Sequence, residues 1–510
     1  MKIGLFAGHP KGLFVCFATE LWERFSYYGM RALLIFYLTE HFLFSDDKSY
    51  AIYGAYTGLA WMLPVIGGIV ADRWLGSRKA VTLGAILLSL GHFGMAIEGP
   101  PALAAAGTAV VEQHGLYMNA FYLSLALIVT GVGFLKTNIT TVVGQLYSLD
   151  DPRRDSAFTI FYMGINIGAT ISPIICGWLG QTYGWRYGFG IAGVGMLTGL
   201  IIFLRGQAHL LGKADPPDPA RLREPVLAGI SREVVIYLGA VLLVLIAWQL
   251  IEHHQIVGAM LGGFGATLGA VILYYSIRHC SPVERDRLLV VAILIVFATV
   301  FWSLYEQQGS SLNLYADRMV NLDVPGMRIE ASQLQSLAPL FLVIAAPFFS
   351  ALWLRLGEQK RDPVLPVKFS IGLVLIGASF FLPWVGAVVA GPGERAGLIW
   401  LTLTFLFMAL GELCLSPIAL NMVTRLCPQR VVGMMMGAYF VSLSAGNYFA
   451  GALAQFTSLQ TVAGEVADPD AAMNTYVSVF NAFAFLGIGA GVLLYLLAPV
   501  LHRRMHEKQG

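Results

Sequence analysis

Apolar stretches of about 20 residues recur along the whole chain, and each is long enough to cross a hydrocarbon core about 30 Å thick as a helix. We expect fourteen such helices, at 15–44, 50–72, 79–98, 117–147, 156–180, 187–205, 233–251, 256–278, 288–314, 332–355, 369–390, 397–424, 432–457 and 473–501. Only 12% of the 510 residues are charged, against about 25% in soluble domains. The sequence therefore predicts an all-α integral membrane protein.

The predicted helices group as six, two and six, because a Pro- and charge-rich linker at 206–232 precedes two plainer apolar helices. The expected divisions are an N-terminal six-helix bundle at 1–205, a linker with an inserted two-helix hairpin at 206–287, and a C-terminal six-helix bundle at 288–510. The two six-helix halves repeat a weak pattern of Tyr, Asn and Gly. Such a repeat suggests a transporter whose site lies between the halves near the membrane midplane.

Lys and Arg collect in alternate loops, which predicts the orientation because cytoplasmic loops are enriched in these residues. The basic set contains Arg73, Arg78, Lys79, Arg153, Arg154, Lys213, Arg221, Arg223, Arg232, Arg278, Arg285, Arg287, Lys360, Arg361, Lys368, Arg425, Arg430, Arg503, Arg504 and Lys508. The opposite set holds only Lys48, Arg186, Arg318, Arg328 and Arg395. We therefore expect both termini in the cytoplasm, which requires an even number of spans.

The first predicted helix carries ionisable residues on one face. Glu20, Glu23, Arg24, Tyr27 and Arg31 stand at helical spacings of 0, 3, 4, 7 and 11, and such spacings place residues on a common side. A charge near the bilayer centre costs at least about 2.5–3.5 kcal/mol, so this stripe must face a protein interior or a watered cavity. It is either a structural ion-pair network or part of a substrate or proton pathway.

Three more ionisable residues lie in the middle of predicted helices: Lys136, Glu306 and Glu412. With Arg31, they give the N-terminal half two cations and the C-terminal half two carboxylates. Each of these charges needs a partner across a cavity. The five cysteines show no paired spacing, so neither a disulfide framework nor a zinc site is predicted.

Three motifs carry a family resemblance. The segment 67–79 resembles the loop motif of the major facilitator superfamily, whose Asp and basic residues latch the cytoplasmic side. The segment 20–29 resembles the ExxERFxYYG motif of the proton-dependent oligopeptide transporter family, and 161–168 resembles a second motif of that family. The resemblance extends over the whole chain, including the two-helix insert typical of bacterial members. It implies the major facilitator fold with 6+2+6 transmembrane helices.

The resemblance also implies pairs that form and break as the halves rock, with Arg31 opposite Glu306, and Lys136 near Glu412 and the helix 1 glutamates. A short peptide is a zwitterion, so its carboxylate can lie against Arg31 and Lys136 and its amino group against Glu412. The expected remainder of the substrate site is Tyr27, Tyr28, Trp61, Tyr162, Asn166, Trp302 and Ser416. The expected proton-coupling residues are Glu20, Glu23, Arg24 and Glu306, since desolvation and like charges raise the proton affinity of carboxylates. Spacing leaves open which glutamate takes the coupled proton.

Three residues depart from the family pattern and alter the pocket. Trp61 stands where a Tyr is common, Ala338 where a peptide-binding Asn is frequent, and Tyr439 where a Trp is common. These changes bear on peptide length preference and affinity. They leave the expected proton machinery unchanged.

We expect a proton-coupled symporter of di- and tripeptides in a bacterial inner membrane. The alternatives are a transporter of another small anion or zwitterion, such as nitrate or a peptide-like drug, and a membrane receptor that binds peptides without moving them. The expected partners are the peptide, protons and the lipid bilayer, with no cofactor, metal or nucleic acid, and a monomer as the functional state. No catalytic pattern such as HExxH accompanies the cavity, so an enzyme is not expected.

Overall fold

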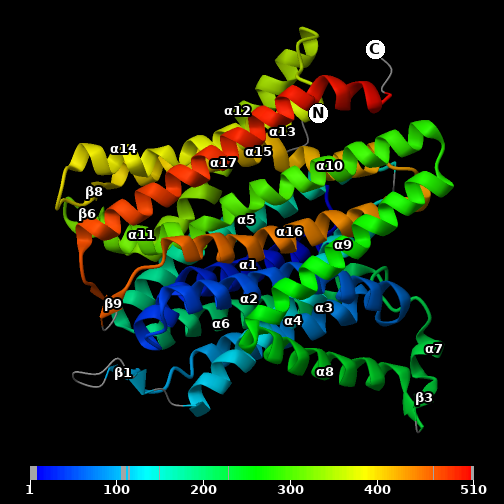
Figure 1. Ribbon diagram of the computed structural model, residues 1–510. Coiled ribbons are helices and arrows are strands. Elements are labelled where there is room, and N and C mark those ends of the chain that lie inside the picture. The colour runs from blue at the N-terminus through cyan, green and yellow to red at the C-terminus, as the bar shows by residue number, and fades with distance from the viewer. Residues whose placement is uncertain are drawn as a thin grey trace. The chain divides into compact units, whose positions relative to one another are not determined.

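The computed structural model describes residues 8–104, 111–112, 115–148, 150–227, 229–462 and 465–506, so the predicted loop residue Lys508 lies outside the described part. Most of the described chain is helical (Figure 1). The α-helices are α1 Lys11–Phe36, α2 Asp46–Val70, α3 Ser77–Met95, α4 Gly115–Gln145, α5 Arg154–Tyr183, α6 Trp185–Gly206, α7 Pro219–Arg223, α8 Arg232–Glu252, α9 His254–His279, α10 Pro282–Tyr305, α11 Ser311–Met319, α12 Leu337–Glu358, α13 Leu365–Ser379, α14 Phe381–Ala390, α15 Leu398–Leu426, α16 Val432–Ala454 and α17 Pro469–Arg504.

Shorter elements extend or connect these helices. They are the π-helices η1 Tyr37–His41 and η2 Ala71–Leu75, and the 3-10 helices η3 Gln207–Leu210, η4 Glu306–Gly309, η5 Ala331–Ser336, η6 Gln429–Val431 and η7 Gln455–Thr457. The antiparallel strand pairs are β1 Leu103–Ala104 with β2 Val111–Glu112, β3 Pro225–Leu227 with β4 Ile230–Ser231, β6 Asp323–Val324 with β7 Met327–Arg328, and β9 Thr461–Val462 with β10 Glu465–Val466. One parallel pair joins β5 Val320–Asn321 to β8 Ala396–Gly397.

Eleven helical segments of the described chain are long and apolar enough to cross a membrane. Three further long helices, α1, α3 and α16, also match predicted spans but contain more charged or small polar residues. The elements therefore confirm the prediction of an all-α membrane protein, and their order follows the fourteen expected spans.

The chain packs into two compact units. Unit 1 consists of residues 1–43 and 59–254, and unit 2 consists of residues 44–58 and 255–510. Helix α2 therefore contributes its first half to unit 2 and its second half to unit 1.

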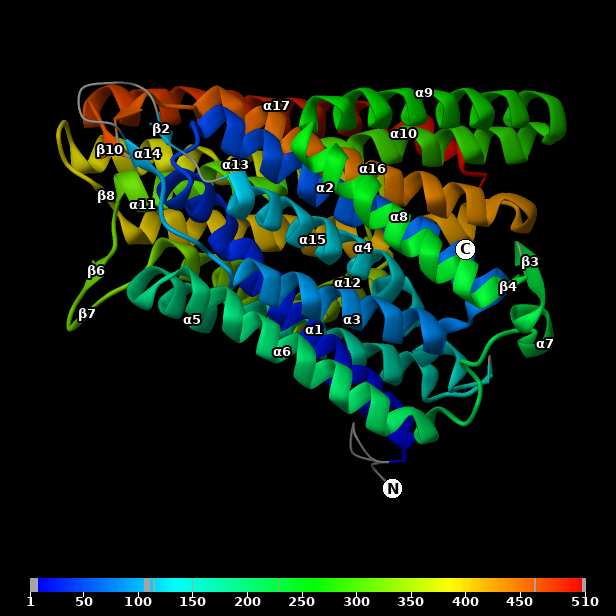
Figure 2. The ribbon, with the colours of Figure 1, turned by 90° about the horizontal axis from the view of Figure 1, so that it is seen from below.

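In unit 1, α1 packs against α5 and α6, while α3 packs against α4 and α6 (Figure 2). The contact between α1 and α5 depends on small residues. A Cβ atom at Gly168 of α5 would overlap the backbone oxygen of Leu21, so only a glycine permits this approach. The close packing fixes the face that α1 turns toward the interior.

In unit 2, α13 packs against α15 and α17, α10 against α16, and α12 against α15. The predicted single helix at 288–314 is broken here. Helix α10 ends at Tyr305, a 3-10 turn follows, and α11 begins at Ser311 and continues to Met319. The break occurs where the apolar run gives way to the polar sequence 306–311.

The side chain of Gln307 forms hydrogen bonds on both sides of this break and to α16. The side-chain nitrogen of Gln307 donates to the carbonyl oxygen of Ser303 at 3.1 Å and to that of Ala450 on α16 at 2.9 Å. The hydroxyl of Ser311 donates to the side-chain oxygen of Gln307 at 2.5 Å. The break in the helix is thus attached to α16 through one glutamine.

The two helices of the inserted hairpin belong to different units. Helix α8 lies in unit 1, where it packs against α4. Helix α9 lies in unit 2 from residue 255 onward, and a Cβ atom at its Gly258 would overlap the hydroxyl of Tyr448 on α16. Each helix of the insert therefore packs on one unit.

The linker before the hairpin covers the predicted latch loop at the start of α3. Arg78 forms an ion pair with Asp215, and its Nη1 donates to the side-chain oxygen of Gln207 at 3.1 Å. Lys79 forms an ion pair with Glu233, the second residue of α8. A Cβ atom at Gly76, whose φ is +74°, would lie 2.5 Å from the nitrogen of Pro216. Within unit 1, acidic residues of the linker and insert therefore engage the basic residues of this loop.

Candidate functional site

The polar stripe of α1 lies inside unit 1, as its spacing predicted. The side chains of Glu20, Glu23, Arg24, Tyr27 and Arg31 are each 3% exposed or less. Arg24 forms ion pairs with both glutamates, and its Nε lies 3.1 Å from Glu20 Oε1. Two carboxylates and one guanidinium therefore share a buried network on a single helix.

Aromatic rings flank the two arginines of α1. The Arg24 guanidinium carbon lies 5.5 Å from the centroid of the Tyr27 ring, and that of Arg31 lies 5.6 Å from the centroid of Tyr28. A cation within about 6 Å of an aromatic face is attracted to it. The tyrosines thus help to retain the buried cations.

Lys136 joins this cluster from the middle of α4. Its Nζ lies 3.0 Å from the ring centroid of Trp61 on α2. Lys136 also interacts electrostatically with Glu20 of α1. Unit 1 therefore brings together three of the predicted proton-coupling residues, Glu20, Glu23 and Arg24, and five of the predicted substrate-binding residues, Tyr27, Tyr28, Arg31, Trp61 and Lys136.

The two predicted residues of α5 differ in exposure. Asn166 is 5% exposed, and its side-chain nitrogen donates to the carbonyl oxygen of Tyr162 at 2.9 Å. This bond leaves its side-chain oxygen as the atom that can accept from a ligand. Tyr162 itself is 51% exposed, so its ring faces open space.

In unit 2, the two predicted carboxylates lie close to each other. Glu306 begins η4 directly after α10 and is 4% exposed, and it acts as a like charge on Glu412 of α15. The hydroxyl of Tyr305 is hydrogen-bonded to the carboxylate of Glu412. Sequence reasoning did not identify Tyr305, although it directly precedes Glu306.

The remaining residues of interest in unit 2 are aromatic or small. Trp302 is buried on α10 and contacts the Tyr305 ring edge-to-face, with centroids 5.4 Å apart. Ser416 is half-buried one turn after Glu412 on α15. Ala338 on α12 and Tyr439 on α16, two of the residues that depart from the family pattern, are both buried.

The expected pairs Arg31–Glu306 and Lys136–Glu412 join residues of different units. The two charges of each pair are opposite in sign, and all four residues are buried or half-buried within their own units. Both pairs remain predictions.

A buried ion pair that the sequence did not reveal joins Asp46, at the start of α2, to Arg318 of α11. Arg318 Nη1 donates to Asp46 Oδ2 at 2.7 Å, and Nη2 donates to Oδ1 at 2.9 Å. The sequence placed Arg318 in a loop, because the predicted helix ended at residue 314. In the structure α11 extends to Met319, and only 8% of the Arg318 side chain is exposed. The available signal in the sequence was that Arg318 is one of only five basic residues in the loops opposite to the basic set.

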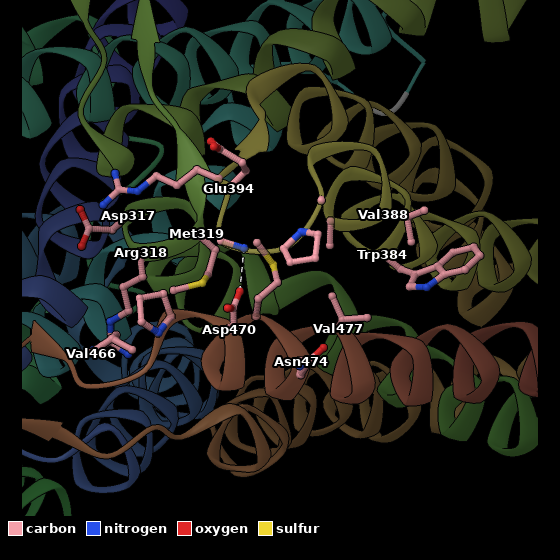
Figure 3. A pocket seen from close by; sticks show the side chains of 17 residues that line it. Asp317, Arg318, Met319, Trp384, Val388, Glu394, Val466, Asp470, Asn474 and Val477 are labelled. Atoms are coloured by element: carbon pink, nitrogen blue, oxygen red, sulfur yellow. Dashed lines mark hydrogen bonds between the residues drawn. The ribbon is translucent and has the colours of Figure 1, made fainter.

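Unit 2 also contains a cavity of about 870 Å³ between α11, α14 and α17 (Figure 3). Its lining combines carboxylates with Arg318, Trp384 and aliphatic side chains, and Asp470 accepts a hydrogen bond from the backbone nitrogen of Gly393 at 2.8 Å. None of the residues predicted for the site, all of which are described, lines this cavity. Among the described residues, no group of three or more His, Cys, Asp or Glu side chains could hold a metal ion.

Comparison with known proteins gives consistent results over almost the full chain. The model of the POT family matches residues 78–469. The chain is 38% identical to the uncharacterized transporter YclF of Bacillus subtilis, covering 98% of this chain and 96% of that protein. It is 35% identical to the peptide transporter YePEPT of Yersinia enterocolitica, covering 99% of this chain and 97% of that protein. It is 31% identical to dipeptide and tripeptide permease A of Salmonella typhimurium, covering 98% and 94%.

Solved structures resemble the chain equally well. A mutant of the peptide transporter POT in complex with alafosfalin superposes with a TM-score of 0.82 at 34% identity, covering 98% of this chain and 97% of that chain. A POT family transporter in complex with 5-aminolevulinic acid superposes with a TM-score of 0.80 at 28% identity, covering 97% and 98%.

Proposed function

This chain belongs to the POT family, and from that premise we propose that it is a proton-coupled symporter that imports di- and tripeptides by alternating access. Membership makes it a multi-pass membrane transporter. The peptide substrate, the proton as the coupling ion and the roles of individual residues are the proposed parts.

The buried cluster of α1 and α4 is the observation that carries the proposal. Glu20, Glu23, Arg24 and Arg31 are each 3% exposed or less, in a helix of a membrane protein. Each such charge costs at least about 2.5–3.5 kcal/mol in an apolar membrane segment, so ionisable groups there are functional candidates by default. Lys136 lies in the same unit and interacts with Glu20. Carboxylates and cations within reach of one another suit both proton transfer and the binding of a zwitterion.

The substrate carboxylate binds to Arg31 and Lys136 through charge-assisted hydrogen bonds. The amino group of the substrate binds to Glu412, and the side-chain oxygen of Asn166 accepts from a peptide N–H group. The peptide side chains lie against Tyr27, Tyr28, Tyr162, Trp302 and neighbouring apolar walls. Trp61 and Ser416 belong to the same substrate site. Because these contacts are mainly apolar, they select loosely among side chains.

Proton coupling uses the same ion pairs. Arg24 pairs with Glu20 and Glu23 in the structure, and protonation of one of these carboxylates weakens its hold on the guanidinium. The freed cation then attracts a remaining carboxylate or the substrate. The pairs Arg31–Glu306 and Lys136–Glu412 form in one state and separate in another, because a ligand shifts an equilibrium only through contacts that differ between the states.

The proposed location is a bacterial inner membrane with both termini in the cytoplasm, based on the Lys and Arg content of alternate loops. We further propose that a monomer suffices for transport and that no metal or organic cofactor takes part. The proton is then the only coupling ion.

Transport by purified protein in proteoliposomes tests this function. We expect radiolabelled dialanine and trialanine to accumulate when an inward proton gradient is imposed, and to only equilibrate when a protonophore is added. Liposomes without protein are the control for leakage. Binding of dialanine without accumulation would indicate a receptor, and accumulation of nitrate or 5-aminolevulinic acid but of neither peptide would overturn the assignment of substrate.

A further inference from the structure

Lys136 lies against the indole of Trp61, at a position where the family pattern commonly has a tyrosine. Its Nζ lies 3.0 Å from the centroid of the Trp61 indole, which places the ammonium directly over the ring. Both residues belong to unit 1, and both are half-buried. Trp is the best aromatic partner for a cation.

The packing of α2 on α4 fixes this contact. A Cβ atom at Gly133 of α4 would lie 2.9 Å from Leu63 Cβ, and one at Gly67 of α2 would overlap the backbone oxygen of Gly133. The two helices therefore touch through backbone atoms at these glycines. Trp61 stands two residues before Leu63, and Lys136 stands three residues after Gly133, so each lies within one helical turn of this contact.

Two hydrogen bonds hold the register of the same contact. Thr137 Oγ1 donates to the carbonyl oxygen of Pro64 at 3.3 Å. Asn138 Nδ2 donates to the carbonyl oxygen of Gly67, also at 3.3 Å. Because the residues directly after Lys136 are bound to the backbone of α2, the base of the lysine side chain cannot slide relative to Trp61.

The end of the lysine side chain needs a separate restraint. A lysine side chain is a flexible four-carbon stem that ends in an ammonium with three donors. It loses considerable rotamer freedom when the ammonium is held in one place. The ring attracts the ammonium without removing its charge. The ammonium therefore keeps its attraction for a carboxylate.

We propose that Trp61 is a positioning residue, which holds the Lys136 ammonium at the point where the substrate carboxylate binds. The proposal rests on the proposed function, in which Lys136 binds that carboxylate. The competing explanation is that the indole only forms a wall for substrate side chains. The two explanations differ in whether the effect of Trp61 depends on Lys136 and on the substrate carboxylate.

The test measures binding of dialanine and of dialanine amide, which lacks the carboxylate, to the full-length protein in detergent by calorimetry. The variants are Trp61→Leu, Trp61→Met, Trp61→Phe, Lys136→Ala and the double variant Trp61→Leu with Lys136→Ala. Trp61→Met provides a flexible apolar side chain in case the smaller leucine disturbs folding, and thermal unfolding of every variant monitors the fold.

Trp61→Leu and Trp61→Met should weaken dialanine binding about 2- to 30-fold, the range that corresponds to the strength of exposed and desolvated cation–π contacts. Trp61→Phe, which keeps an aromatic face, should restore most of the affinity. Binding of the amide should be weakened clearly less than binding of dialanine in all three variants. In the Lys136→Ala background, Trp61→Leu should have no further effect on dialanine.

Equal losses for dialanine and its amide would show that the indole is a wall and would overturn the proposal. So would an undiminished effect of Trp61→Leu in the Lys136→Ala background, or wild-type affinity in both Trp61→Leu and Trp61→Met. If the wild-type protein bound neither ligand, the proposed function itself would be wrong. The failures of the two proposals are therefore distinguishable.

Discussion

Replacing Asp46 by Asn should destabilise the protein strongly, although the substitution changes only one atom of the side chain. The Asp46 side chain is 1% exposed and that of Arg318 is 8% exposed. Arg318 donates two hydrogen bonds to the carboxylate, at 2.7 and 2.9 Å, and a third at 3.3 Å to the hydroxyl of Tyr476. The backbone nitrogen of Leu459 donates to the same carboxylate at 3.0 Å.

The expected magnitude follows from these contacts. Removing one partner of a buried pair costs about 3–5 kcal/mol, because the other charge stays buried without compensation. The introduced asparagine would keep an oxygen for the Leu459 nitrogen, so the lower value of about 3 kcal/mol is expected. For a folded unit of this size, 1 kcal/mol changes the unfolding temperature by about 2–4 °C. We therefore expect a decrease of about 6–12 °C.

Thermal unfolding of the purified protein in detergent, followed by intrinsic fluorescence, measures this decrease. Asp47→Asn is the matched control, because Asp47 is exposed and its carboxylate accepts one hydrogen bond, from Ser458 at 2.7 Å. The control should change the unfolding temperature by no more than about 2 °C, as surface substitutions usually change the free energy of unfolding by about 0.5 kcal/mol or less. Adding Arg318→Met to Asp46→Asn should recover part of the loss. Equal shifts for Asp46→Asn and Asp47→Asn would refute the reasoning.

Three further predictions concern the ionisable residues. Proteoliposomes with Glu23→Gln should still exchange peptide but should not accumulate it under a proton gradient, since a permanently neutral side chain cannot respond to pH. Accumulation equal to that of the wild type would exclude Glu23 from coupling. Lys136→Ala should abolish driven uptake, which normal dialanine uptake by a folded variant would contradict. Near the first helix, Arg153 holds the pKa of Asp151 at about 2 through hydrogen bonds to its carboxylate. Because this pKa lies below that of an unfolded Asp, about 3.9, the Asp151–Arg153 pair should stabilise the turn above pH 4 and be lost as the pH falls through about 2. Spin-label distances between this turn and the segment before α1, to which Arg153 donates a hydrogen bond, should stay constant from pH 7 to 4 in the wild type and widen in Asp151→Asn.

The buried stripe of α1 was predictable because two local facts determine it. Helical spacing places Glu20, Glu23, Arg24 and Arg31 on one side, and the cost of charge in a bilayer requires that side to face inward. Both facts depend only on residues within one helix. The burial of all four side chains confirms the prediction.

Contacts between distant residues were not predictable in the same way. Asp46 and Arg318 are 272 residues apart, and each looked like a loop charge beside a helix end. Trp61 and Lys136 were both expected near the substrate, but spacing contains no information on whether an indole and an ammonium from different helices meet. The break at Glu306 was also missed, because the span at 288–314 was predicted from its length and apolar content, which do not locate a break within a helix.

The break between α10 and α11 divides one helix of unit 2 into a long arm and a short arm. The break lies at Glu306, where Gln307 is attached to α16, and beyond it α11 is fixed to Asp46 through Arg318, so a tilt of α10 would have its pivot there. Helix α10 is the long arm, with 24 residues and a length of about 36 Å. A tilt of about 10° around the pivot would move the Pro282 end by about 6 Å and leave Glu306 almost stationary. A carboxylate at a pivot can exchange protons and partners at a constant position while the far end of its own helix moves by more than one helical turn.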